Sequence, residues 1–505
     1  MVVRPRSKKR LLSQLLKGIA EVSSHQECEI QGLTLNSQHV VSGDLFVALS
    51  GTRRHGADFI SQAVRSGAVA VLCEQTEGLP EAWGCGVPVF VIEALDQQLG
   101  QVASRFFGHP SREMKIIGVT GTNGKTTCSQ LLAQALSDKH LCGVIGTLGN
   151  GLYGQLEASD YTTPDVIEVH RLLSEMRDAG AQYVVMEVSS HGLEQGRVEG
   201  VAFDIAVLTN LSRDHLDYHG DMKSYGAAKR RLFEMPGLKH AVINTDDAFG
   251  RALLHELTGH MQLTAYSLEL SHGLPANPLV SGQQLKLGHD GIQMLVRDPK
   301  GRTNIKSALL GRFNAANLLA VYSVLLWLGL QRNLIAARLA KCTSVPGRME
   351  CFSQPDLPLV VVDYAHTPEA LEQVLEALRE HCAGKLWCLF GCGGDRDKGK
   401  RPLMGALAEN LADKVILTDD NPRDEDGARI IVDILSGVEY RGDITVIADR
   451  TEAISFAVAE AAADDVVLVA GKGHEDYQLV AGEVLPFSDA ELVVECMAQR
   501  LEAAS

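Results

Sequence analysis

A glycine-rich turn between an apolar stretch and a helical pattern is the feature that most constrains the fold. Residues 114–127 read MKIIGVTGTNGKTT, an apolar β-rich run that leads into Gly121-Thr-Asn-Gly-Lys-Thr126. Glycines allow several backbone N–H groups to point at one anion, Lys125 adds positive charge, and Thr126 offers a hydroxyl to a magnesium ion. The apolar positions that follow repeat at helical spacing, so a bound phosphate would face a helix N-terminus. The segment predicts a strand, a phosphate-binding loop and a helix.

The spacing of this loop departs from the strict nucleotide-binding motif. That motif has a glycine five positions before Gly124, where this chain has Val119. A glycine turn that simply precedes a helix is the alternative interpretation. The loop is therefore interpreted as a variant phosphate loop.

Length, charge and cysteine content narrow the class of protein. A chain of 505 residues is too long for one core and suggests about three domains. The net charge of −16 argues against broad electrostatic binding to nucleic acid or to an anionic membrane. The longest apolar runs, such as residues 318–330, fall short of the roughly 20 residues that span a bilayer, and no signal peptide is evident. The 11 cysteines lack paired metal-binding spacing, so we expect reduced thiols in a cytoplasmic protein without nucleic-acid or membrane partners.

Glycine and proline clusters divide the chain into three parts, with breaks at residues 107–111 and 344–347. Strands that alternate with helices imply an α/β fold with largely parallel sheets. Residues 262–306 interrupt this rhythm and are expected to form an antiparallel edge or insertion. The predicted domains are a small N-terminal α/β domain, a central phosphate-loop domain with a mostly parallel sheet, and a C-terminal Rossmann-like, doubly wound domain, over residues 1–110, 111–343 and 344–505.

Polar segments directly follow four apolar, β-rich runs in the third domain. These segments are residues 363–366, 391–396, 418–423 and 471–475. Open parallel sheets bind ligands beyond the carboxyl ends of their strands, so the four segments are expected to converge.

Two of these segments carry cations in an acidic chain. Residues 391–402 contain Arg396, Lys398, Lys400 and Arg401, a pattern that favours a local anion site over a solvated turn. Asp420-Asn-Pro-Arg423 presents a guanidinium from a proline-pinned turn, which suits a bidentate grip on a carboxylate. A simple turn with an exposed arginine explains the second pattern almost as well.

The central domain holds further candidates. Glu187 ends an apolar run, and it could hold the magnesium of ATP if its strand neighbours the phosphate-loop strand; alone it would be read as a helix cap or a surface acid. Residues 209–220 are dense in Asp and His, which suits metal ligation, although a satisfied structural histidine is the simpler interpretation of His219. The spacing around Lys229 favours a solvated helix face.

Taken together, these motifs resemble the Mur ligases of peptidoglycan synthesis, most closely those that add meso-diaminopimelate. The resemblance covers nearly the whole chain, with the motifs in family order. The motifs are Gly121-Thr-Asn-Gly-Lys-Thr, Glu187-Val-Ser-Ser-His, Asn210-Leu-Ser-Arg-Asp-His-Leu-Asp-Tyr-His, Asp363-Tyr-Ala-His-Thr-Pro and Asp420-Asn-Pro-Arg. The resemblance implies three domains, a monomer, and a ligase in which ATP phosphorylates the D-glutamate carboxylate of UDP-MurNAc-L-Ala-D-Glu. The diaminopimelate amine would then attack the acyl phosphate.

The resemblance also implies roles for individual residues. The catalytic residues would be Lys125, Glu187, His215 and Lys229. The cofactor would be Mg²⁺, with ligands Thr126, Glu187, His215 and Lys229 in carbamylated form. ATP would contact Gly121, Thr122, Asn123, Gly124, Lys125, Thr126, Thr127, Asn314, Asn317, Arg348, Asp363 and His366. The UDP-MurNAc-dipeptide would contact Leu35, Ser37, His55, Thr162, Thr163, Ser189, Gln195 and Arg197. Diaminopimelate would contact Arg396, Asp420, Asn421, Pro422, Arg423, Gly471 and Glu475.

The choice of amino acid depends on Arg423, because lysine-adding relatives lack this arginine. Diaminopimelate has one carboxylate more than lysine, which Arg423 and Arg396 could pair, while Glu475 could accept hydrogen bonds from its ammonium. The alternatives are a lysine-adding ligase, a folylpolyglutamate-type ligase, which would lack the first domain, and a phosphate-loop switch or motor, which would lack an amino-acid site. The chain departs from its relatives at Asn36-Ser37-Gln38, where they often read Asp-Ser-Arg.

Overall fold

The computed structural model describes residues 9–504 except 52–53, 78, 80–83, 160, 270–277, 289, 441 and 443. Backbone contacts divide the chain into two compact units, of which the first ends essentially at Tyr266 and the second runs from Val280 to Ser505. This division falls inside the predicted central domain, whose last strands and helices belong with the second unit. The three predicted domain ranges therefore stay a prediction. No helix within the described ranges is long and apolar enough to cross a membrane.

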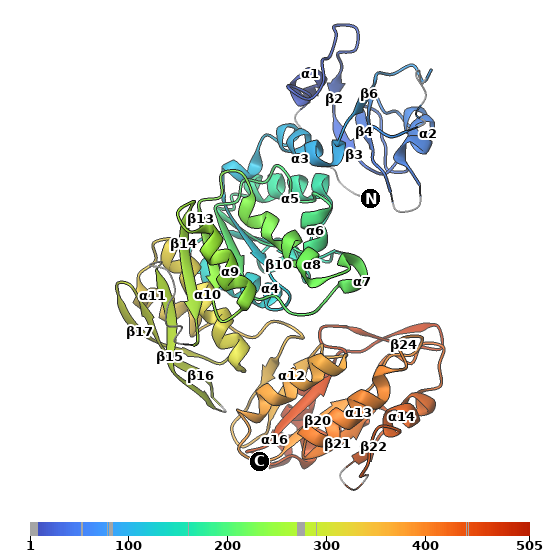
Figure 1. The fold of residues 1–505 in the computed structure, drawn as a ribbon. Coiled ribbons are helices and arrows are strands. Elements are labelled where there is room, and N and C mark those ends of the chain that lie inside the picture. The colour runs from blue at the N-terminus through green and yellow to red at the C-terminus, as the bar shows by residue number, and fades with distance from the viewer. Residues whose placement is uncertain are drawn as a thin grey trace. The chain divides into compact units, whose positions relative to one another are not determined.

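The N-terminal part of the first unit is built on a parallel sheet of four strands, as the sequence predicted for a small α/β domain (Figure 1). Its strands, in spatial order, are β3 (Gly32–Thr34), β4 (Asp44–Ala48), β5 (Ala70–Glu74) and β6 (Val89–Ile92). The flanking elements are β1 (Arg10–Leu11), α1 (Leu12–Leu15), β2 (Glu29–Ile30), the 3-10 helix η1 (Gly56–Phe59), α2 (Ile60–Arg65) and α3 (Leu95–Phe106).

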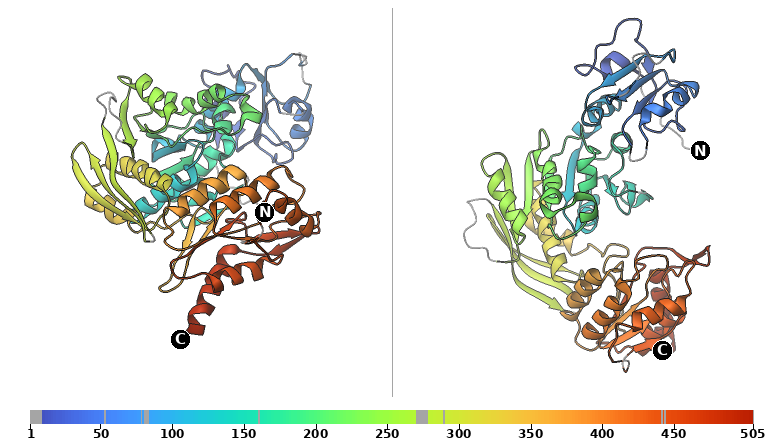
Figure 2. Two further views of the ribbon diagram at one scale, coloured as in Figure 1. Left: turned by 60° about the horizontal axis from the view of Figure 1, so that its bottom comes forward. Right: turned by 45° about the vertical axis from the view of Figure 1, so that its right-hand side comes forward.

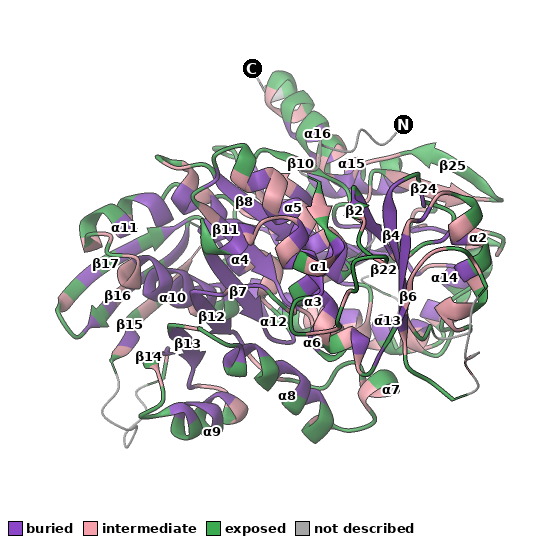
Figure 3. Cartoon of the chain, turned by 90° about the horizontal axis from the view of Figure 1, so that it is seen from above, coloured by how far each residue is buried: buried purple, intermediate pink, exposed green. Residues whose placement is uncertain are grey.

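The rest of the first unit surrounds a larger sheet that carries the phosphate loop. Its spatial order is β10 (Gln155–Glu157), β9 (Gly149–Leu152), β8 (Cys142–Gly146), β11 (Tyr183–Glu187), β7 (Lys115–Thr120), β12 (Ile205–Leu208), β13 (His240–Asn244) and β14 (Gln262–Ser267). The neighbouring strands β8, β11, β7, β12, β13 and β14 run parallel, whereas β9 and β10 pair antiparallel at the edge. Both faces of the parallel strands are buried (Figure 3), which is why these strands are almost continuously apolar. Its helices are α4 (Lys125–Ser137), α5 (Val166–Asp178), α6 (Ser190–Glu194), α7 (Leu216–His219), α8 (Met222–Arg230) and α9 (Ala248–Leu257), with 3-10 helices η2 (Pro110–Arg112) and η3 (Arg231–Glu234).

The second unit begins with an antiparallel set of strands, which confirms most of the prediction for residues 262–306. These strands are β15 (Leu279–Gly288), β16 (Gly291–Asp298) and β17 (Gly301–Ser307), followed by α10 (Arg312–Trp327) and α11 (Arg332–Leu339). The prediction was wrong for the first strand of that range, because β14 pairs parallel to β13.

The C-terminal sheet has the doubly wound form that the sequence predicted. Its spatial order is β18 (Glu350–Phe352), β19 (Leu359–Asp363), β23 (Val466–Ala470), β20 (Leu386–Phe390), β21 (Lys414–Leu417) and β22 (Ile444–Val446), with only β18 antiparallel to its neighbour. Its other elements are α12 (Pro368–Arg379), α13 (Lys400–Leu411), α14 (Gly427–Leu435), α15 (Arg450–Glu460), β24 (Tyr477–Val480), β25 (Glu483–Pro486) and α16 (Asp489–Ala504).

Two apolar clusters cover the two faces of the C-terminal sheet. One packs against α12, α13 and α14, and the other packs against α15 and α16; the orange helices of the first group are visible in Figure 2. The four polar segments follow β19, β20, β21 and β23, which are adjacent parallel strands. Their predicted convergence at one sheet edge is therefore confirmed.

Candidate functional site

The phosphate loop has the predicted arrangement of strand, turn and helix. Strand β7 ends at Thr120 and α4 begins at Lys125. Gly121 and Gly124 connect them with φ values of 149° and 82°, a conformation that other residues rarely adopt. The Lys125 ammonium donates to the carbonyls of Gly121 at 2.9 Å and Thr122 at 2.8 Å. The Lys125 side chain thus lies across the loop, where it is expected to add positive charge for a bound phosphate.

Glu187 lies against this loop, because β11 pairs parallel to β7. Its fully buried carboxylate accepts hydrogen bonds from the hydroxyl of Thr126 at 2.9 Å and from the amide and hydroxyl of Thr147, each at 3.0 Å. The Thr147 hydroxyl also contacts that of Thr162 at 3.0 Å. The predicted placement is confirmed, and the interpretation of Glu187 as a surface acid or helix cap was wrong. Carboxylate and hydroxyl oxygens in contact are a donor set that suits Mg²⁺.

Lys229 contradicts the expectation of a solvated helix face. The residue is 1% exposed, and its ammonium donates to the Gly121 carbonyl at 2.7 Å and lies 4.4 Å from the centre of the Tyr225 ring. Burial, with a smaller contribution from the charge of Lys125, lowers the pKa of Lys229 to about 6. The expectation failed because α8 packs the face that bears Tyr225 and Lys229 against the phosphate loop, so the charge-rich sequence next to Lys229 did not indicate exposure.

Two histidines near this loop have different surroundings. The side chain of His219 is buried and contacts the Glu194 carboxylate at 3.0 Å and the Ser190 hydroxyl at 3.0 Å, which confirms the structural interpretation. His215 is about half exposed and its ring lies 4.9 Å from that of His191. Among the described residues, no three His, Cys, Asp or Glu side chains are grouped closely enough to hold a metal ion. Shared ligation of Mg²⁺ by Glu187 and His215 therefore stays a prediction.

Most of the residues predicted to bind the dipeptide substrate lie together beside Glu187. Thr163 donates its hydroxyl to the Glu187 carbonyl at 2.9 Å and accepts the Ser189 amide at 3.0 Å. Arg197 donates to the Thr163 carbonyl at 2.7 Å and to the side-chain oxygen of Gln195 at 3.0 Å. The chain thus brings these polar groups next to the carboxylate that faces the phosphate loop.

The other residues predicted to bind the UDP-MurNAc-dipeptide lie in the N-terminal part of the first unit, where Ser37 and Nδ1 of His55 are hydrogen-bonded. Ser37 is buried and donates to the Gln62 side chain at 3.3 Å, and Leu35 is partly buried nearby in sequence. His55 accepts the Ala57 amide through Nδ1 at 3.0 Å, while its buried Nε2 has no hydrogen-bond partner among the described residues. A shared substrate site that includes Thr163 therefore stays a prediction.

The remaining nucleotide residues belong to the second unit. Asn314 is buried on α10, donates to the Leu310 carbonyl at 2.8 Å, and accepts from Asn317 at 3.0 Å. Asp363 ends β19 and accepts the Met349 amide at 2.7 Å, and burial raises the pKa of Asp363 to about 6. Two further predicted residues lie near the Tyr364 ring. The Cζ atom of Arg348 is 5.3 Å from the ring centre, and the ring centre of the exposed His366 is 4.6 Å from it. Their joint contact with ATP stays a prediction.

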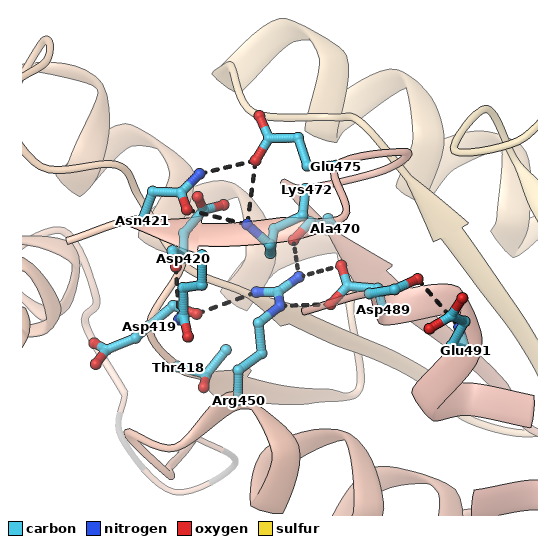
Figure 4. A network of polar contacts seen from close by, with 12 residues as sticks. Thr418, Asp419, Asp420, Asn421, Arg450, Ala470, Lys472, Glu475, Asp489 and Glu491 are labelled. Carbon is cyan, nitrogen blue, oxygen red and sulfur yellow. Dashed lines mark hydrogen bonds and ion pairs between the residues drawn. The ribbon is translucent and has the colours of Figure 1, made fainter. Parts of the chain in front are cut away.

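The residues predicted to bind diaminopimelate lie on loops at the carboxyl edge of the C-terminal sheet; Figure 4 shows Asp420, Asn421 and Glu475 among them. Asn421 donates to the Glu475 carboxylate at 2.8 Å. A Cβ added at Gly471 would lie only 2.4 Å from the Asp420 carboxylate, so the loops after β21 and β23 are in direct contact.

Arg423 reaches the loop after β20 from the turn that includes the buried Pro422. Its guanidinium donates to the Gly394 carbonyl at 2.8 Å, and a Cβ at Gly393 would lie 2.8 Å from Arg423 and 3.7 Å from Arg396. Arg423 is partly buried, unlike the exposed arginine of the simpler turn interpretation.

The predicted anion site in residues 391–402 is only partly realised. Arg401 is fully buried and pairs with Glu425 at 3.0 Å and with Asp433 at 2.8 Å. Lys398 also pairs with Glu425 at 3.0 Å. These cations neutralise acids of the same domain. Arg396, in contrast, is exposed and lies near Arg423, which is predicted to bind diaminopimelate.

Two residues of this region escaped the sequence prediction. Lys472 is fully buried between Asn421 and Glu475; its place in the predicted loop Gly471-Lys-Gly-His-Glu475 was an available signal. Arg450 is fully buried and pairs with Asp489, and nothing in the local sequence indicated this partner.

Comparison with known proteins supports the same assignment along the chain. Family models described as "Mur ligase family, catalytic domain", "Mur ligase middle domain" and "Mur ligase, glutamate ligase domain" match residues 29–107, 119–325 and 347–473. The UDP-N-acetylmuramoyl-L-alanyl-D-glutamate–2,6-diaminopimelate ligase of Pseudomonas aeruginosa is 52% identical over 93% of this chain and 95% of its own length. The ligase of the same name from Alkalilimnicola ehrlichii is 48% identical over 97% and 99%.

Solved structures are similar over nearly the full length. One described as a UDP-N-acetylmuramoyl-L-alanyl-D-glutamate–2,6-diaminopimelate ligase has a TM-score of 0.77 at 36% identity, covering 98% of this chain and all 100% of its own. MurF from Acinetobacter baumannii has a TM-score of 0.61 at 19% identity, covering 99% of this chain and 100% of its own, and shares the fold. The chain belongs to the Mur ligase family.

Proposed function

We propose that the protein is an ATP-dependent amide ligase that joins meso-diaminopimelate to UDP-MurNAc-L-Ala-D-Glu in bacterial peptidoglycan precursor synthesis. The observation that carries the proposal is that Asn421 contacts both charged residues: its side chain donates to the Glu475 carboxylate at 2.8 Å, and its carbonyl accepts from the Arg423 guanidinium at 3.5 Å. A guanidinium and a carboxylate that both contact one residue match an amino-acid end that bears both a carboxylate and an ammonium. The names of the relatives with about half of their residues identical support the same substrate pair.

The chemistry requires activation of a carboxylate, which acylates poorly until one oxygen becomes a phosphate leaving group. ATP and the carboxylate substrate are both anions, so their approach needs positive charge at the phosphate loop, which Lys125 provides. Thr126 and Glu187 are in contact and would hold Mg²⁺, which supplies further charge stabilisation when bound.

Lys229 is proposed to act in carbamylated form, as the family resemblance implies. A buried lysine with a pKa near 6 is mostly neutral at pH 7, and a neutral amine can react with carbon dioxide. The modified side chain would carry negative charge close to the Gly121 carbonyl of the phosphate loop. We further propose action in the cytoplasm, where ATP and UDP-linked precursors are present, and as a monomer, because one chain supplies all the site residues named above.

The proposal is tested by phosphate release from ATP in the presence of UDP-MurNAc-L-Ala-D-Glu. Release is expected only when an amino acid is added, with meso-diaminopimelate far more effective than lysine, because lysine would leave Arg423 without a carboxylate partner. Equal rates with the two amino acids would overturn the assigned specificity. Release without any amino acid would overturn the ligase assignment.

Replacement of Arg423 by alanine is expected to raise the KM for diaminopimelate by about 10- to 100-fold, because a hydrogen-bonded ion contact is lost. The KM for ATP should stay within about twofold of the wild-type value. The same phosphate-release assay gives the KM for diaminopimelate and the KM for ATP. Arg429→Ala, an exposed arginine on α14, is the matched control. A rise in the KM for ATP instead would show that Arg423 had been assigned to the wrong ligand.

A further inference from the structure

Lys472 presents a fully buried ammonium in the loop that follows β23. It donates to Oδ1 of Asn421 at 3.1 Å and to Oε2 of Glu475 at 3.2 Å (Figure 4). It also lies 5.6 Å from the centre of the Tyr477 ring. A buried charge is costly unless its partners are held in place around it. The lysine and its two polar partners therefore form one unit.

Lys472 and the Leu479 amide together determine which way the Asn421 amide faces. Both Lys472 and the Leu479 amide can only donate, and both meet Oδ1 of Asn421, at 3.1 and 2.9 Å. A flipped amide would place its NH₂ group against two donors. The amide nitrogen is therefore turned toward Glu475, to which it donates at 2.8 Å.

The two donors converge on a single oxygen of Glu475. Oε2 accepts hydrogen bonds from Lys472 and Asn421, and no hydrogen bond from the described residues reaches Oε1. The side chain keeps 18% exposure, so Oε1 can meet a ligand. A carboxylate oxygen accepts but never donates when ionised, which suits an ammonium group.

We propose that Lys472 is a positioning residue for amino-acid specificity. By fixing Asn421 and Oε2 of Glu475, it directs Oε1 toward the ammonium at the end of diaminopimelate whose carboxylate meets Arg423. Lysine has the ammonium but lacks the carboxylate, so discrimination requires Glu475 to hold the ammonium where the carboxylate beside it can reach Arg423. This inference rests on the proposed function and adds a residue that does not itself touch the substrate.

The test is Lys472→Met, which keeps an unbranched side chain of nearly the same length but removes its charge. Steady-state kinetics are measured by phosphate release with diaminopimelate, lysine and ATP varied separately. The KM for diaminopimelate is expected to rise about 10- to 100-fold, with kcat and the KM for ATP within about twofold, and preference over lysine is expected to fall. Lys385→Met, an exposed lysine just before β20 at the opposite end of the strands, is the matched control and should behave as wild type.

A double-mutant cycle separates positioning from general support of the fold. If Lys472 acts through Glu475, then Lys472→Met should change the KM for diaminopimelate by less than about twofold once Glu475→Gln is present. The proposal would be overturned if the two substitutions raised the KM for diaminopimelate independently, so that their fold-changes multiply in the double variant. It would also be overturned if Lys472→Met lowered kcat and raised the KM for diaminopimelate and the KM for ATP by the same factor. If circular dichroism shows that the methionine variant does not fold, the neutral but polar Lys472→Gln takes its place under the same criteria.

The two proposals fail in distinguishable ways. Wild-type protein that releases phosphate without regard to diaminopimelate would contradict the proposed function. Wild-type protein that depends on diaminopimelate, alongside a Lys472→Met variant with unchanged KM and unchanged preference over lysine, would contradict only the role of Lys472.

Discussion

Replacement of Glu187 by glutamine is expected to lower kcat for diaminopimelate-dependent phosphate release by about 10²- to 10³-fold, because a charge-stabilising group is lost at the site of phosphoryl transfer. The carboxylate is fully buried and receives the Thr126 hydroxyl and both donors of Thr147. Glutamine has the same shape, and its oxygen can still accept the Thr147 amide. Its NH₂ group, however, would face the hydroxyls and cannot serve as a metal ligand.

The variant is expected to lose rate and affinity for Mg²⁺ while its fold is retained. The concentration of Mg²⁺ that gives half-maximal rate should rise along with the fall in kcat, while the circular dichroism spectrum should match that of the wild type. Glu157→Gln, on an exposed residue of β10, provides the control. A Glu187→Gln variant with a wild-type magnesium requirement would exclude Glu187 as a metal ligand.

The sequence predicted the phosphate loop and Glu187 well because their geometry follows from local pattern and parallel pairing. A glycine turn after a buried strand places its residues at the carboxyl edge, and Glu187 reaches the same edge when β11 pairs with β7. The convergence of the Asn421 and Glu475 loops follows from the same rule. These parts of the site required no knowledge of side-chain packing.

The environment of Lys229 could not be predicted in this way. Its helical position follows from the sequence, but its burial depends on how α8 packs on a loop more than a hundred residues earlier, as the 108-residue separation from Gly121 shows. The pKa shift is a consequence of that packing. The density of charged residues around Lys229 in the sequence instead predicted an exposed helix face.

The pairing of Arg450 with Asp489 was hidden for a related reason. The two residues are 39 positions apart, and each begins a different helix. Arg450 also donates to the Ala470 carbonyl at 3.0 Å and the Asp419 carbonyl at 3.4 Å, so it connects the end of β23 to the segment that follows β21 (Figure 4). Only the assembled sheet brings these four groups to one place.

The Asp489→Asn variant is expected to lose about 3–5 kcal/mol of local stability in the C-terminal sheet, because it leaves a buried guanidinium without its anion. Both side chains are fully buried, and two N–O contacts of 2.7 Å join them. Because a chain of two compact units need not unfold in one step, the measurement is native-state hydrogen exchange of the amides in β21 and β23. Asp464→Asn, at an exposed position, should change these free energies by less than about 0.5 kcal/mol.

A second variant identifies the physical cause of that loss. Arg450→Met combined with Asp489→Leu removes both charges and fills the space with apolar atoms, so the cost of an uncompensated ion disappears. The double variant should recover part of the lost stability, but not all of it, since the carbonyls of Ala470 and Asp419 lose their donor. If it is no more stable than Asp489→Asn, then the guanidinium hydrogen bonds to the two strand ends, and not the unpaired charge, hold this edge of the sheet together.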